Sequence, residues 1–155
     1  MAQPSIVVRK SLERATLQYQ EHLAEAEGYL AGRGIDLEAA RSSALGVVRD
    51  PIPGHEHLNG RLAIPYMTPA GPVNMNFRCR QSHKCKDVGH PKYIMWSGLE
   101  VNLYNVSALH IAGSAIAVAE GEVDALSSTL AGLFLHSAWS IIKDARGDLA
   151  RSQSG

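Results

Sequence analysis

The chain has 155 residues, with 15 lysines and arginines balanced by 15 aspartates and glutamates, so its formal net charge is zero. This balance, with 45% hydrophobic residues, excludes a polybasic histone-like binder and a low-complexity disordered chain. No apolar run approaches the roughly 18 residues needed to span a bilayer, and no signal-peptide pattern begins the sequence. Two cysteines are too few for a disulfide scaffold. We therefore expect a soluble, cytoplasmic, globular protein.

The first third of the sequence predicts helices. Residues 11–33 form the pattern of an amphipathic helix that starts at Ser11 as its N-cap and ends near Gly34. Its apolar positions recur at spacings of three and four and are Leu12, Ala15, Tyr19, Leu23, Ala26 and Leu30. Asp36 is the expected N-cap of a short second helix, and the proline-rich stretch 50–54 breaks the chain.

From Gly60 the pattern predicts strands. Residues 61–66 and 72–77 read as two strands joined by a turn over 68–71. Residues 79–92 are polar, basic and rich in glycine and histidine, which is typical of a loop.

A short apolar run at 114–119 predicts a buried parallel strand, followed by a helix over 123–130. Glu120 then lies at the carboxyl edge of a sheet, where open α/β folds place their sites. Asp124 follows about one helical turn later, so the two carboxylates can reach one divalent cation such as Mg²⁺. The alternative is that these acids only favour a helix N-terminus through its dipole.

A second group of candidate ligands comprises Cys79, His83, Cys85 and His90. Two cysteines and two histidines can make a tetrahedral zinc site. The spacing lacks the usual Cys-x2-Cys knuckle, so the alternative is a basic loop with incidental thiols.

Charge is unevenly distributed along the chain. Residues 61–92 hold six basic residues against one acid, whereas residues 93–142 hold four acids and no lysine or arginine. A basic segment beside an acidic one indicates phosphate contacts next to a cation-binding edge. A solvated loop is the alternative.

Eight segments, taken in order, resemble the catalytic core of bacterial-type (DnaG-type) DNA primases, in the divergent form carried by actinobacterial phages. The resemblance runs along about four fifths of the chain. The segments are 19–23, 29–35, 44–48, 60–65, 71–80, 91–93, 103–105 and 116–126. The last of these matches the first motif of a TOPRIM domain, a strand followed by Glu120-Gly-Glu-Val-Asp124.

The resemblance implies an α/β fold, with a mixed α+β front subdomain followed by the start of a TOPRIM α/β sheet. It divides the chain into a helical first segment (1–59), a basic mixed-strand subdomain (60–110), the first TOPRIM strand–helix unit (111–133) and an atypical helical tail (134–155). The tail is read as helical because its apolar residues recur at spacings of three and four.

The implied activity is DNA-templated synthesis of RNA primers by metal-assisted nucleotidyl transfer in phage DNA replication. Glu120 and Asp124 would be the catalytic acids and hold Mg²⁺ or Mn²⁺. The side chains implied to bind template and nucleotides are Arg61, Arg78, Arg80, Lys92 and Tyr93. The implied partners are single-stranded DNA, nucleoside triphosphates, the RNA primer and a replicative helicase, in the cytoplasm of a host cell if the gene belongs to a phage.

The sequence also departs from the family pattern. The TOPRIM domain takes most of its metal ligands from a later Asp-x-Asp strand, which this sequence lacks, and the resemblance stops after Leu133. We therefore expect a truncated or split primase, inactive alone, that needs a second primase polypeptide. The alternatives are another TOPRIM protein such as a nuclease, or a non-catalytic fragment that binds nucleic acid or docks on a partner.

Overall fold

The computed structural model describes residues 4–100, 102–106, 117–131 and 135–137. The chain divides into two compact units, residues 1–100 and residues 101–155. Both contain helices and strands, which confirms the predicted mixed α/β class. Within the described part of the chain, no helix is both long enough and apolar enough to cross a membrane.

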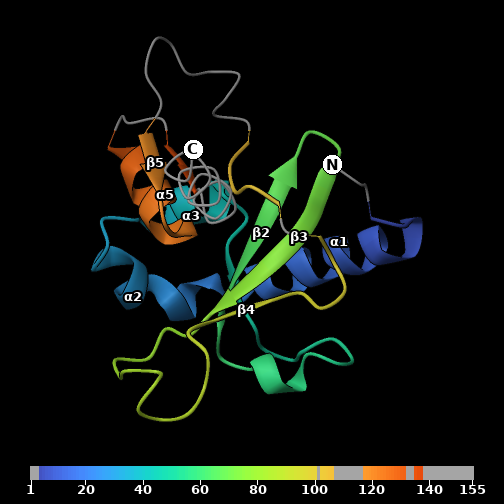
Figure 1. The fold of residues 1–155 in the computed structure, drawn as a ribbon, viewed down its shortest axis with the longest axis horizontal. Helices are drawn as coiled ribbons and strands as arrows, with labels where there is room; N and C mark the ends of the chain where they lie inside the picture. The colour runs from blue at the N-terminus through green and yellow to red at the C-terminus, as the bar shows by residue number, and fades with distance from the viewer. Residues whose placement is uncertain (1–3, 101, 107–116, 132–134, 138–155) are drawn as a thin grey trace, which may run out of the picture. The chain divides into compact units, whose positions relative to one another are not determined.

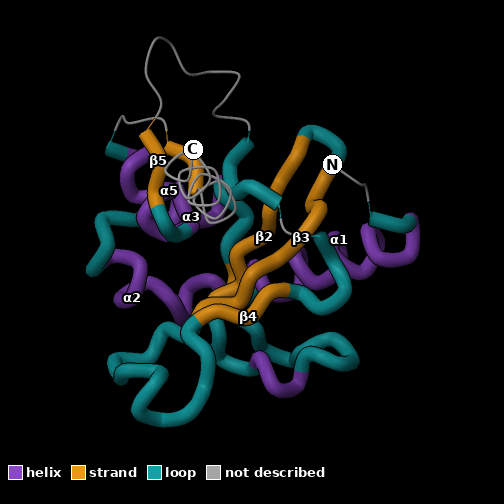
Figure 2. Tube along the Cα trace, viewed as in Figure 1, coloured by secondary structure: helices purple, strands orange, loops and turns teal. Residues whose placement is uncertain are grey.

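The first unit consists of short helices followed by an antiparallel sheet (Figure 1). Its helical elements are α1 (Ile6–Gln20), the 3-10 turn η1 (Leu23–Ala26), α2 (Glu27–Ala31), α3 (Leu37–Ser42) and the 3-10 turn η2 (Glu56–Leu58). Its strands, in their order across the sheet, are β1 (Gly46–Val47), β2 (Leu62–Thr68), β3 (Gly71–Arg78) and β4 (Tyr93–Met95). All neighbouring pairs are antiparallel, as Figure 2 shows for the long central hairpin.

The β2–β3 hairpin is the predicted strand–turn–strand. Its register pairs Leu62 with Arg78 at the open end and Thr68 with Gly71 at the turn. The Thr68 hydroxyl accepts the Ala70 N–H and donates to the Gly71 carbonyl, which closes the turn. Gly71 has φ +104°, a conformation that favours glycine.

Helix α1 packs against the sheet through its apolar stripe, and the helix and sheet together form the core (Figure 1). The six predicted apolar positions, from Leu12 to Leu30, are all fully buried. Tyr19 meets Phe77 of β3 edge-on, with ring centroids 6.5 Å apart. Burial of Leu12, Ala15 and Tyr19 in the same core as β3 fixes the face that α1 presents to the sheet, whereas the later positions of the stripe lie in η1 and α2.

The single helix predicted over 11–33 is wrong. Ser5 caps α1 instead of Ser11, which lies within the helix and donates to the Val7 carbonyl. The helix ends at Gln20 because β1 crosses that end at close range: a Cβ on Gly46 would lie 2.4 Å from the Tyr19 carbonyl carbon. The chain therefore turns and continues as η1 and α2. The Asp36 cap is confirmed, since its carboxylate accepts the Ala39 N–H at 2.7 Å.

The second unit contains a strand–helix–strand arrangement: β5 (Ala117–Ala119), α5 (Glu122–Leu130) and β6 (Leu135–Ser137). Strands β5 and β6 pair in parallel, as expected for a crossover through a helix. The predicted strand and helix around Glu120 are confirmed at the described residues, and 114–116 lie outside them. The predicted burial of the strand is wrong at Val118, which is 54% exposed. The helical tail predicted from 134 onward is wrong at 135–137, because pairing with β5 makes this segment a strand. The tail's remaining residues lie outside the described ranges.

Candidate functional site

The predicted acidic edge is formed by the exit from β5. Glu120 directly follows the strand and is exposed, and Gly121 is extended before α5 begins. Asp124 is exposed in the first turn of α5. Because β5 and β6 run parallel, the carboxyl end of β6 lies at the same edge as Glu120. This edge is where parallel α/β sheets present ligand-binding groups.

Glu122, between these two acids, has a different environment. It is buried, and its charge raises the pKa of Tyr104, which burial has already raised strongly. Glu122 therefore faces the interior of the second unit, while Glu120 and Asp124 face solvent. Glu122 is therefore a structural acid, whereas Glu120 and Asp124 are accessible to a cation.

Arg78, at the end of β3, is only 5% exposed. Its guanidinium donates a hydrogen bond to the Tyr93 hydroxyl and lies 5.0 Å from the centre of that ring. The Tyr29 ring centre is 5.8 Å away on another element, α2. The structure thus brings two predicted ligand-binding residues, Arg78 and Tyr93, into direct contact.

Arg80 is held by the backbone and by Glu25. It donates to the carbonyls of Gly60, at 2.8 Å, and Glu25, at 2.6 Å. The Glu25 carboxylate also accepts from Arg49 at 2.8 Å, and this bond is the main reason why its pKa is lowered. Arg80 therefore ties the start of the 79–92 loop to η1 and to the turn before β2.

Arg61 ties down the other end of that loop. Its guanidinium donates to the carbonyls of Pro91, at 3.0 Å, and Lys92, at 3.3 Å. Lys92 itself is exposed, with its ammonium 5.8 Å from the Tyr93 ring centre. Of the predicted nucleic-acid-binding cations, Lys92 is the one left exposed, whereas Arg61, Arg78 and Arg80 make intramolecular contacts.

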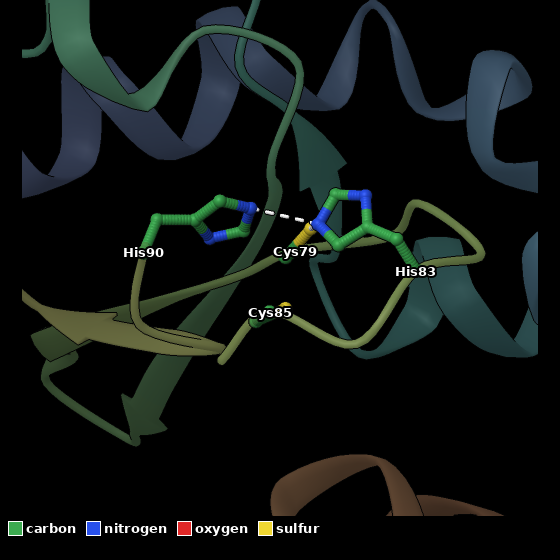
Figure 3. Close-up of side chains that lie close together, drawn as sticks. All are labelled: Cys79, His83, Cys85 and His90. Carbon is green, nitrogen blue, oxygen red and sulfur yellow. Dashed lines mark hydrogen bonds between the residues drawn. The ribbon is translucent and has the colours of Figure 1, made fainter. Parts of the chain in front are cut away.

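The cysteine–histidine set converges in the first unit (Figure 3). One ligand atom from each of Cys79, His83, Cys85 and His90 lies within 4.8 Å of every other, and all four side chains are half-buried. The two histidine Nε2 atoms are 2.7 Å apart, and His83 Nε2 lies 3.7 Å from Cys79 Sγ. Burial raises the pKa of the Cys85 thiol, and the neighbouring Cys79 raises it further.

The fold places further residues around this region to which no single motif in the sequence points. The Arg33 guanidinium stacks 3.8 Å above the Tyr29 ring centre. Lys84 and Lys86 are exposed on the 79–92 loop. The excess of basic residues in 61–92 includes the two lysines and indicates them. In contrast, nothing in the residue spacing points to the Arg33–Tyr29 pair.

Comparison with solved structures identifies the class of fold. The chain is similar to the Aquifex aeolicus primase, crystallised with its zinc binding and RNA polymerase domains, at TM-score 0.65 and 24% identity over 84% of this chain and 41% of that one. It is also similar to the RNA polymerase domain of Mycobacterium tuberculosis primase DnaG in complex with double-stranded DNA, at TM-score 0.66 and 20% identity over 88% and 56%. The fold is that of bacterial primase RNA polymerase domains.

A curated relative is the Gene 57 protein of Mycobacterium phage D29, which is 36% identical over 74 residues. The match covers 48% of each chain, so it spans about half of that relative's length. No family model matches the chain. The resemblance to the DnaG-type primase core is thus confirmed at the level of fold, and a mycobacteriophage relative fits the phage form of it.

Proposed function

We propose that this chain is part of a phage DNA primase that synthesises RNA primers on single-stranded DNA in the cytoplasm of the host cell. The observation that carries the proposal is the exposed Glu120 at the exit of β5, within a chain that has the fold of primase RNA polymerase domains. In such a reaction a 3′ hydroxyl attacks the α-phosphate of an incoming nucleoside triphosphate and releases pyrophosphate.

Glu120 and Asp124 would hold Mg²⁺ or Mn²⁺. Both acids are exposed in one strand–turn–helix unit, Glu120 directly after β5 and Asp124 in the first turn of α5. Two carboxylates suit a hard cation that keeps several waters for exchange with phosphate oxygens. When bound, the cation supplies charge stabilisation for the reacting phosphate. Glu120 is also placed to accept a hydrogen bond from a nucleotide hydroxyl or from a metal-bound water.

Binding of template and primer would use the exposed lysines of the first unit. Lys84, Lys86 and Lys92 present ammonium groups on or beside the loop after β3. Phosphate contacts of this kind supply sequence-independent affinity that decreases as salt rises. Arg61, Arg78 and Arg80 would support this surface by holding the loop and the Tyr93 side chain in place.

The remaining acidic ligands of the reaction would come from residues outside this sequence. The family's later Asp-x-Asp pair has no counterpart here, since no two aspartates are separated by one residue. We therefore propose that a second polypeptide, or a frameshifted continuation of this one, completes the metal site. Two carboxylates alone leave most of the triphosphate's charge without compensation.

Primer synthesis on single-stranded DNA with ribonucleoside triphosphates and Mn²⁺ tests the proposal. The chain is assayed alone and together with the product of the adjacent downstream reading frame. We expect little or no primer from the chain alone and robust synthesis from the mixture. Glu120→Gln should reduce the mixture's rate by about 100-fold or more, because a neutral amide binds the cation weakly. Glu38→Gln, which alters an exposed acid of α3, is the matched control and should leave the rate unchanged.

Two results would contradict the proposal. Primer synthesis that survives Glu120→Gln would remove this carboxylate from the reaction. DNA binding without synthesis, in the chain and in the mixture alike, would favour the alternative of a nucleic-acid-binding fragment.

A further inference from the structure

We propose that Cys79, His83, Cys85 and His90 bind one zinc ion, which fixes the long basic loop between β3 and β4. This inference does not depend on the proposed enzymatic activity, because the four residues belong to the first unit and the acidic edge to the second. Figure 3 shows the four side chains pointing toward a common centre.

The distances are close to those of a tetrahedral site, and the pairs that are up to 4.8 Å apart would close by as much as about 1 Å around the ion. Zinc bonds of about 2.0–2.1 Å to nitrogen and 2.3 Å to sulfur set neighbouring ligand atoms about 3.3–3.8 Å apart. The 3.7 Å between Cys79 Sγ and His83 Nε2 lies in this range. The two Nε2 atoms of His83 and His90 are hydrogen-bonded at 2.7 Å and would separate by about 0.6 Å to accommodate the ion, a shift within reach of side-chain rotation.

The donor set selects zinc over the cations of phosphate chemistry. Two thiolates and two imidazoles are soft and borderline ligands, whereas Mg²⁺ and Ca²⁺ prefer oxygen. Four protein ligands fill a tetrahedral shell, which is typical of a structural rather than a catalytic zinc site.

The ring nitrogen of His90 that faces away from the cluster contacts the backbone. His90 Nδ1 lies 3.1 Å from the Pro91 carbonyl, which accepts an N–H, and 3.3 Å from Arg61 Nη2, which only donates. Zinc binding at Nε2 would select the tautomer in which Nδ1 donates to the carbonyl. Arg61 donates to the same carbonyl at 3.0 Å. A backbone acceptor on the distal ring nitrogen is the usual partner of a zinc-bound histidine, because it fixes the tautomer and the ring plane.

The loop that carries the four ligands has no regular secondary structure and little apolar packing. Residues 79–92 join two neighbouring strands and contain no helix or strand of their own. Their one large aliphatic side chain, Val88, is 55% exposed, so apolar packing does not hold the loop together. The Cys79 N–H bonds the Lys92 carbonyl at 2.8 Å, which closes the base of the loop. Inside the span 83–90 the described backbone bonds are short-range turns, the longest in sequence running from the His90 N–H to the Cys85 carbonyl at 3.1 Å. A loop of this length with ordered ligands and no apolar core is what a metal ion stabilises.

Metal analysis of the full chain, purified without a histidine tag, tests the inference. We expect about one zinc per chain in the wild type and less than about 0.2 in Cys85→Ser and in His90→Gln. His57→Gln alters an exposed histidine of η2 outside the cluster and should retain the full amount.

Cobalt substitution of the wild-type chain keeps the test independent of how the variants fold. Tetrahedral Co²⁺ bound by two thiolates should give intense visible d–d bands and thiolate charge-transfer absorption, and adding zinc should abolish both. Absence of zinc together with absence of this cobalt spectrum would overturn the inference. A Cys79–Cys85 disulfide in freshly purified, metal-free protein, detected by mass, would overturn it as well.

Discussion

The Tyr19 hydroxyl lies 2.9 Å from His55 Nδ1 inside the core of the first unit, so the end of α1 is hydrogen-bonded to the irregular segment before β2. The same hydroxyl accepts the Ile52 N–H at 3.2 Å. One phenol thus satisfies two buried groups that are 33 and 36 residues away in the sequence. It also explains how the proline-rich break 50–54 is fixed against a helix that precedes it by thirty residues.

Tyr19→Phe should destabilise the protein by about 1–3 kcal/mol, because it leaves a backbone N–H and an imidazole nitrogen buried without their partner. The free energy of unfolding in urea, followed by circular dichroism, measures the effect. Leu17→Ala, on the same helix but 67% exposed, is the control and should change stability by less than about 0.5 kcal/mol. A Tyr19→Phe protein as stable as the wild type would show that solvent replaces both bonds.

Stability should also fall on acidification because of His55. Burial lowers the pKa of His55, and the nearby His57 lowers it further, against a smaller opposing effect of Glu56. The unfolded chain therefore takes up a proton below about pH 6.5 while the folded chain does not. The stability that neutral His55 contributes is complete above that pH and is lost as pH falls below it. The slope for one proton is at most about 1.4 kcal/mol per pH unit.

Urea unfolding at several pH values between 7.5 and 5, on the order of half a unit apart, measures this dependence. The comparison with His55→Gln isolates it, since the variant lacks the titrating group while other carboxyl and histidine groups remain. The difference in unfolding free energy between the two proteins should decrease as pH falls. A difference that stays constant with pH would mean that His55 titrates alike in both states.

Gly46→Ala should be strongly destabilising. A Cβ at this position would lie 2.4 Å from the Tyr19 carbonyl carbon and 2.7 Å from the Gln20 nitrogen, both backbone atoms that cannot rotate away. Strand β1 and the end of α1 would have to separate, at a cost of about 2–3 kcal/mol by analogy with overpacked cores. Thermal unfolding measures the loss.

Gly28→Ala is the matched control for Gly46→Ala. A Cβ on Gly28 meets no atom within 4 Å, and the residue lies in α2. Alanine should therefore be neutral or stabilise by up to about 1 kcal/mol. If both variants unfolded at the wild-type temperature, the close approach of β1 to α1 would be disproved.

Local signals in the sequence predicted the hairpin, the Asp36 cap and the strand–helix unit around Glu120, because each depends on neighbouring residues. The break of the first helix depends instead on Gly46, which is 26 residues beyond Gln20, and no proline or glycine marks it. Strand β6 was missed for the same reason: the apolar residues on either side of it, from Phe134 to Leu149, have helical spacing, and pairing with β5 decides otherwise.

All four members of the cysteine–histidine cluster were predicted from the sequence, but their convergence in space was not. Their spacing matches no zinc knuckle, so the pattern favoured a plain basic loop over a zinc site. Convergence follows from the fold: β3 and β4 are adjacent antiparallel strands, so Cys79 after one and His90 before the other lie at the same end of the sheet. In contrast, the intramolecular bonds of Arg61 and Arg80 have no sequence signal, because most of their acceptors are backbone carbonyls.

If zinc holds the 79–92 loop, its removal should expose the loop to trypsin. Lys84 and Lys86 are exposed, so cleavage after them depends on how readily the backbone opens rather than on access to the side chains. We expect a chelator to speed cleavage at these two lysines by on the order of tenfold, and His90→Gln to do so without a chelator. Mass spectrometry of the fragments over time measures each rate. Cleavage after Lys10, exposed on α1, should keep the same rate in all conditions and serves as the internal control. Equal rates at Lys84 and Lys86 with and without chelator would show that the loop is held by its backbone hydrogen bonds and by Arg61 and Arg80 alone.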